Sequence, residues 1–351
     1  MCVTIDQDDY AAQLNPVDTL PVNMESEHLL KQLLPESFKA QFLSLLGGLS
    51  WLLQTRLDAA VYVQALQRNA QTPRYEHLVR LNKVCKWVRR TKASIFFQKL
   101  TPPCKILVVS DAAFRKEDKS GLAMRGALIA LCEQRPNSPG GKWQILEYYS
   151  RKQRRVTRST FAAELHAVAD ALELGRMIGY AMTELLLESP PDAAEILRRE
   201  ETGRLSMPLE ATVDCRSVWD ALKLPEVRVP SEITLVMVLH QLKEHLQTGT
   251  IGALWWVDTR DCVVDGLTKG AIGRRALLLA ASAGEWLLNY AALRHTEPSS
   301  AARQLQGAAD SIYRPAEAAA TMHTAPSASS SSMLIYDLAN SRACSTWSIA
   351  N

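Results

Sequence analysis

The sequence predicts a mixed α/β fold: a five-stranded sheet with helices on both faces, preceded by a small helical subdomain. Three apolar runs lie close together and are joined by short connections, which predicts an antiparallel meander. Helical patterns then alternate with two further strand-like runs, which is typical of a sheet covered on both sides. The expected strands are 105–109, 122–131, 143–149, 209–213 and 252–257.

The individual elements rest on local patterns. Residues 105–109 read KILVV, a β-branched apolar run that predicts a buried strand. The turn-rich RPNSPGGK at 135–142 separates the second and third strands. A long amphipathic helix is expected over 160–178, with Ser159 or Thr160 as its N-cap. Residues 186–208 are expected to form a loop with a short helix. Two further helices are expected over 233–246 and 271–283.

The segment 38–99 is helical in pattern, with one helix over 75–91 that carries apolar residues on one face. Its other face is basic. This face is either a solvated surface or a nucleic-acid contact, and the pattern alone does not choose between them. The residues concerned are Arg80, Lys83, Lys86, Arg89 and Arg90.

Composition narrows the class of protein. The 351 residues carry a net charge of +3, which is too mild to indicate a nucleic-acid partner without clustering. The seven cysteines are scattered without a CxxC pair, which favours a reducing intracellular compartment and buried or idle thiols. No secretory signal and no apolar stretch of about 20 residues is present, so neither secretion nor a membrane is expected.

The two ends differ from the middle. Residues 1–37 mix acidic residues and prolines and are expected to be a short lead-in. Residues 291–351 form a tail that includes the Ala- and Ser-rich 291–333, which cannot build a packed core and is expected to be disordered. The last residues are either a docking segment or an incidental tail. The predicted units are therefore 1–37, 38–101, 102–290 and 291–351.

Four acidic residues fall at the ends of predicted elements. Asp111 follows the first strand, Glu164 lies one turn into the long helix, and Asp214 follows the fourth strand. Asp265 opens the last helical stretch. If the first and fourth strands are parallel neighbours, Asp111 and Asp214 meet at one edge of the sheet. Converging carboxylates need counter-charge, and oxygen ligands suit Mg²⁺. Each acid alone is more often a cap or turn residue, so the prediction rests on the ordered set.

A basic run precedes the helix that carries Glu164. Its position beside the predicted metal site favours phosphate contacts over a merely solvated edge. We therefore expect nucleic-acid contacts from this run and from the groups that neighbour the acids. These residues are Ser110, Arg151, Lys152, Arg154, Arg155, Arg158, Ser159, Thr160 and Arg216.

The motifs around the acids resemble the ribonuclease H domain of copia-type retrotransposon polyproteins. The matching segments are VVSDAAF, RSTFAAELHAVADAL, VDCRSVWDAL and VVDGLTKG. The resemblance implies a ribonuclease H-like domain over 102–290 with Asp111, Glu164, Asp214 and Asp265 as its catalytic and metal-binding acids. It also implies a metal-dependent endonuclease that uses two Mg²⁺ (or Mn²⁺) ions to hydrolyse the RNA strand of RNA–DNA hybrids.

The resemblance extends upstream to the helical stretch that follows the polymerase palm in these polyproteins. It is carried by Gln54, Thr55, Arg56, Asp58, Pro73 and His77. The Tyr-x-Asp-Asp polymerase motif is absent from the sequence, so no reverse transcriptase activity is expected. The resemblance implies a truncated polyprotein whose missing polymerase portion is a possible partner. It also implies an intracellular location, either cytoplasmic in a virus-like particle or nuclear.

Two other functions compete with this expectation. An inactive or domesticated fragment would bind nucleic acid or a partner without catalysis. An integrase or transposase of the same superfamily would need a D-D-E order, whereas the glutamate here comes second. Many ribonucleases H carry a mobile histidine before the last acid, but segment 256–264 contains none. His240 and His245, on the preceding helix, are expected on its solvent face and are not assigned to catalysis.

Overall fold

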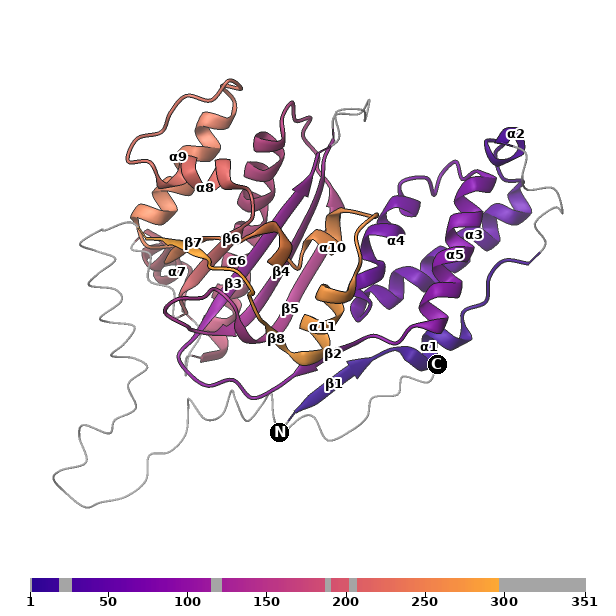
Figure 1. Cartoon of the computed structure of the whole chain (residues 1–351), viewed down its shortest axis with the longest axis horizontal. Helices are drawn as coiled ribbons and strands as arrows, with labels where there is room; N and C mark the ends of the chain where they lie inside the picture. Colours follow the sequence, from indigo (N-terminus) through magenta and orange to yellow (C-terminus); the bar gives the residue numbers. More distant parts are fainter. Residues whose placement is uncertain (1, 19–26, 115–121, 187–190, 202–206, 297–351) are drawn as a thin grey trace, which may run out of the picture.

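A seven-stranded mixed sheet forms the centre of the molecule (Figure 1). The structure, a computed structural model, describes residues 2–18, 27–114, 122–186, 191–201 and 207–296. The strand order in the sheet is β8-β5-β4-β3-β6-β7-β9. The strands span Cys104–Ala113 (β3), Met124–Glu133 (β4), Gly141–Lys152 (β5), Leu209–Val213 (β6), Ala253–Trp256 (β7), Glu285–Trp286 (β8) and Leu293–His295 (β9).

The pairing confirms the mixed sheet and corrects its size. Strands β3, β4 and β5 form the expected antiparallel meander, and β6 and β7 add to β3 in parallel. Short antiparallel strands β8 and β9 close the two edges, so the sheet has seven strands and not five. These edge strands have two and three residues. Strands so short leave no alternating pattern in a sequence.

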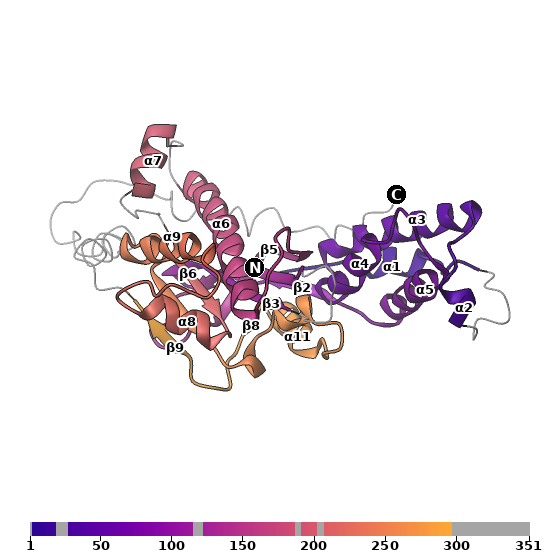
Figure 2. The ribbon, with the colours of Figure 1, turned by 90° about the horizontal axis from the view of Figure 1, so that it is seen from above.

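Helices cover both faces of the sheet, as expected, because alternate residues of each strand point to opposite sides. On β3, Ile106 and Val108 belong to one core, with residues of α6 (Thr160–Leu186), α8 (Arg216–Lys223) and α9 (Leu235–Gln247). Leu107 and Val109 belong to the other core, with residues of α10 (Asp265–Thr268) and α11 (Arg275–Ala283). Figure 2 shows α6 and α11 on opposite sides of the sheet.

The segment before the sheet is mainly helical and has its own core, to which α3 (Glu36–Trp51), α4 (Ala60–Gln67) and α5 (Tyr75–Arg90) contribute. The 3-10 turns η1 (Leu52–Gln54) and η2 (Leu57–Ala59) join α3 to α4. Leu57, Ala60 and Ile95 also pack into the second core of the large sheet. The helical region is therefore seated directly on the face that carries α10 and α11.

A two-stranded sheet corrects one expectation for this region. Residues 94–97, within the segment predicted to be helical, form strand β2 (Ser94–Phe97), which pairs with β1 (Val3–Asp6). The β-branched and aromatic SIFF favours a strand once a partner is present. The remaining short elements are α1 (Asp8–Gln13), α2 (Glu27–Leu30), α7 (Ala193–Glu201) and η3 (Thr259–Asp261).

The C-terminal expectation is partly wrong. Residues 293–295, placed in the disordered tail, form β9 against β7. Residues 297–351, which include the rest of that tail, lie outside the described residues. None of the described helices combines the length and the apolar character that a membrane crossing requires.

Candidate metal centre

Two parallel strands bring the first and third acids together. Ser110 of β3 is paired with Val213 of β6, so the next residues, Asp111 and Asp214, lie side by side at the carboxyl end of this strand pair. Asp111 lies within β3 and not after it, because β3 continues to pair with β4 as far as Ala113. The condition stated above, that the first and fourth strands are parallel neighbours, is therefore met, and the first strand is longer than expected.

Helix α6 supplies the second acid. Its first turn is capped by Ser159, whose Oγ accepts a hydrogen bond from the N–H of Ala162 at 3.1 Å. Glu164 follows one turn later, and its Oε2 accepts a hydrogen bond from the N–H of Ala112 at 3.0 Å. One oxygen from each of Asp111, Glu164 and Asp214 lies within 4.8 Å of the others. Three of the four predicted acids thus form one oxygen cluster.

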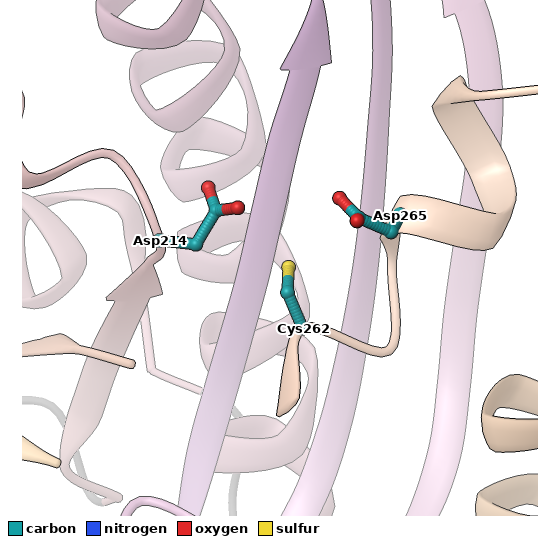
Figure 3. A group of neighbouring side chains, drawn as sticks. All are labelled: Asp214, Cys262 and Asp265. Atoms are coloured by element: carbon teal, nitrogen blue, oxygen red, sulfur yellow. The ribbon is translucent and has the colours of Figure 1, made fainter. Parts of the chain in front are cut away.

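Helix α10 supplies the fourth acid from the opposite face. Gly126 of β4 allows this approach, because a Cβ there would lie 2.8 Å from both Leu267 Cβ and Thr268 Cγ2. The Thr268 hydroxyl donates to Asp111 Oδ2. Asp265 joins a second group with Asp214 and Cys262, whose ligand atoms also lie within 4.8 Å of one another (Figure 3).

One lysine lies inside the cluster. The Lys269 ammonium is 2.5 Å from Asp265 Oδ1 and 3.4 Å from Asp111 Oδ1. Burial lowers the pKa of Lys269, but its carboxylate neighbours, Asp111 and Asp265 foremost, outweigh this effect and raise it. A single ammonium therefore faces several carboxyl groups.

The carboxyl groups have strongly perturbed proton affinities. Burial, and then the charge of Asp111, raise the pKa of Asp214 to about 7 and that of Asp265 to about 6. The same two causes raise the pKa of Glu164 well above its usual range. Burial raises the pKa of the Cys262 thiol as well. These shifts mean that the site lacks positive charge. A divalent cation would supply that charge, and the oxygen donors fit Mg²⁺ or Mn²⁺.

The residues expected to contact nucleic acid fall into three groups. Ser110 is 1% exposed because β3 is covered on both faces, so its hydroxyl is not available to a polymer, and this corrects the expectation. Ser159 is used as the helix cap. The others are exposed, or half-buried in the case of Lys152: Arg151, Lys152, Arg154, Arg155, Arg158, Thr160 and Arg216.

Two of these arginines are held against aromatic rings. The Arg216 guanidinium lies 4.7 Å from the centre of the Trp219 ring and 5.2 Å from that of Trp256. The Arg151 guanidinium lies 5.0 Å from the centre of the Tyr149 ring. Such stacking limits the motion of the side chains. Arg216 is also ion-paired with Asp220, at 3.1 Å.

The expectation for the histidines is half right. His240 is exposed, as expected. His245 is partly buried against α6, where its Nε2 is 3.3 Å from Arg176 Nη1, and burial lowers its pKa. Neither residue lies in the two groups of potential metal ligands.

Sequence reasoning missed the residues that position the acids. Asp261 anchors the loop before Asp265, and Thr268 and Lys269 contact Asp111 or Asp265. Gly126 makes room for α10. The DGLTK segment held a signal for two of them, since Thr268 and Lys269 follow Asp265 at helical spacings of three and four. Asp261 and Gly126 had no such signal.

Comparison with known proteins leaves the family open. No protein-family model matches the chain, and no curated protein matches it. Among solved structures, the chain is similar to LC11-RNase H1, isolated from compost by a metagenomic approach. The sequence identity is 16% and the TM-score 0.31, over 49% of this chain and 98% of that chain.

Proposed function

We propose that this protein is a metal-dependent endonuclease of the ribonuclease H type, which hydrolyses the RNA strand of RNA–DNA hybrids. The observation that carries the proposal is the meeting of Asp111, Glu164, Asp214 and Asp265 near the carboxyl ends of β3 and β6. These residues come from four elements that are far apart in the sequence, and their charges are poorly neutralised. Buried carboxylates with so little counter-charge destabilise a fold, so the cluster does not serve stability.

The four carboxylates would hold two divalent ions, Mg²⁺ or Mn²⁺. Bound there, the ions would supply an activated water and stabilise the leaving oxygen of the cleaved phosphodiester. The chain's own residues position the site: the Ala112 N–H orients Glu164, and the Thr268 hydroxyl orients Asp111. Arg154, Arg155 and Arg158 would contact phosphates, which makes binding depend on salt.

The finer identity, part of a copia-type retrotransposon polymerase, belongs to the same proposal. It is supported by the motifs at the four acids and in the upstream helices. A hybrid would be recognised through groove shape and 2′-hydroxyls and not through base sequence.

A catalytically inactive fragment that binds nucleic acid is the second candidate. The observation that favours it is the Lys269 ammonium, which already contacts Asp265 and Asp111. If this ion pair were permanent, it would compete with a metal ion for the same oxygens.

Cleavage of a labelled RNA–DNA hybrid by the full chain separates the two candidates. We expect cleavage of the RNA strand with Mg²⁺ or Mn²⁺, none in EDTA, and none in Asp111→Asn. Single-stranded RNA and duplex DNA serve as substrate controls. Without metal, Asp111→Asn should be more stable than the parent by about 1 kcal/mol, because the lost repulsion from the other carboxylates outweighs the weakened 3.4 Å contact with Lys269. Hybrid binding without cleavage in either metal would establish the inactive candidate.

A further inference from the structure

Cys262 is an unexpected member of the acidic site. Its side chain is 6% exposed, and no hydrogen bond joins its Sγ to another residue of the described chain. The sulfur points into the space between the carboxylates of Asp214 and Asp265 (Figure 3). Its Sγ and one oxygen of each carboxylate lie within 4.8 Å of one another. A buried thiol aimed at two carboxylates is therefore a potential third donor.

The loop that carries Cys262 is held in place. The Asp261 carboxylate accepts hydrogen bonds from the Asn289 N–H and side-chain amide, both at 2.9 Å, and from the Tyr290 N–H at 2.8 Å. The Trp286 indole donates to the Asp261 carbonyl at 3.1 Å. Cys262 and Asp265 follow this anchor and are linked by a hydrogen bond from the Asp265 N–H to the Cys262 carbonyl at 3.3 Å. The backbone that carries two of the three donors is thus held in place before any ion binds.

We propose that Asp214, Cys262 and Asp265 form a mixed oxygen–sulfur site for a thiophilic divalent cation such as Zn²⁺ or Cd²⁺. Thiolate ligands select such ions, whereas Mg²⁺ prefers oxygen alone. Zn–O and Zn–S bonds are about 2.0–2.3 Å long, so small side-chain rotations would bring all three donors to one ion. Binding would transfer the thiol proton to solvent, since the thiolate is the ligand.

The mixed site shares Asp214 with the oxygen cluster of Asp111 and Glu164. A thiophilic ion held by Cys262 would therefore compete with the second Mg²⁺ and inhibit cleavage. This consequence rests on the proposed nuclease function, whereas the binding of the ion itself does not.

Titration of the EDTA-stripped full chain with Cd²⁺ tests the site without nucleic acid. Cd²⁺–thiolate bonds absorb in the ultraviolet, so we expect an absorption band that saturates at one ion per chain. In Cys262→Ser the band should vanish and the Cd²⁺ affinity should fall by about tenfold or more. The Mg²⁺ affinity, measured by calorimetry, should stay unchanged, which shows that the carboxylates are still in place.

Cys215→Ser is the matched control, because Cys215 also lies beside the acids but is half-buried and contacts Ser217 at 3.2 Å. This variant should keep the band. The inference is overturned if the parent shows no band, if the band persists in Cys262→Ser, or if Cys215→Ser loses it. Cd²⁺ binding through Cys262 in a chain that never cleaves hybrid would refute the nuclease function alone.

Discussion

Two buried groups of charge in this molecule differ in how well they are neutralised. In the helical region, Arg56 and Asp58 form an ion pair that is almost fully buried. All five guanidinium N–H groups find acceptors: both Asp58 oxygens, the Thr91 hydroxyl, and the carbonyls of Val88 and Thr91. In the acidic site, Lys269 contacts two of the four predicted acids, Asp111 and Asp265. The pKa values of Asp214 and Asp265 are nevertheless raised.

The difference indicates that the Arg56–Asp58 pair is structural, whereas the acidic site is proposed to be functional. The Arg56–Asp58 pair joins η2 to the end of α5 and needs nothing further. Under the proposed function a cation would complete the acidic site, and without one its carboxylates cost stability. Both groups were singled out by the same family resemblance, so motif residues alone do not reveal which kind of cluster they form.

The largest loss of stability is expected from breaking the buried Arg56–Asp58 ion pair. Arg56→Ala leaves the Asp58 carboxylate buried without its partner and should lower the free energy of unfolding by about 3–5 kcal/mol. Urea unfolding followed by circular dichroism measures this. Asp258 and Arg260 form a pair with the same spacing and similar bond lengths, but its arginine is exposed. Arg260→Ala is therefore the matched control and should leave the midpoint nearly unchanged. Equal losses of unfolding free energy in Arg56→Ala and Arg260→Ala would show that burial does not make the Arg56–Asp58 pair special.

A smaller loss of stability is expected when α10, which carries Asp265, is displaced from the sheet. Gly126→Val places atoms against Leu267 and Thr268, pushes α10 outward, and should destabilise the chain by about 1–3 kcal/mol. Asp265 would move with α10, so the Mg²⁺ affinity and the rate of hybrid cleavage should both fall. In α3, a Cβ at Gly47 meets nothing within 4 Å, so Gly47→Ala serves as the control and should retain both. Normal Mg²⁺ affinity in Gly126→Val would show that α10 does not depend on this glycine.

The sequence predicted the acids better than their surroundings. Asp111 and Asp214 were recognisable because the ends of parallel strands meet at one edge. Ser110 was expected to contact nucleic acid but is buried, because β3 is covered on both faces, and that coverage depends on distant segments. Gly126 and Cys262 gave no signal, since their roles depend on how closely α10 and its loop approach the sheet. That approach is set by contacts between segments more than 100 residues apart.

The smallest expected effect is on how stability depends on pH. Raised pKa values of about 7 for Asp214 and about 6 for Asp265 mean that the folded chain holds these protons more tightly than the unfolded chain, where the pKa is about 3.9. This contribution to stability is full below about pH 4 and is lost as the pH rises through 6 to 7. Burial lowers the pKa of His77, His166 and His245, which acts in the opposite direction.

The test is therefore the difference between parent and variant in EDTA. From pH 5 to 8, Asp214→Asn should gain roughly 1–2 kcal/mol relative to the parent, as judged by urea unfolding at each pH. Excess Mg²⁺ should remove most of this gain, because the ion binds the ionised carboxylates of the parent. A constant difference across the range would mean that neither burial nor the neighbouring carboxylates raise the pKa of Asp214 in the folded chain. The acidic site would then be as well neutralised as the Arg56–Asp58 pair.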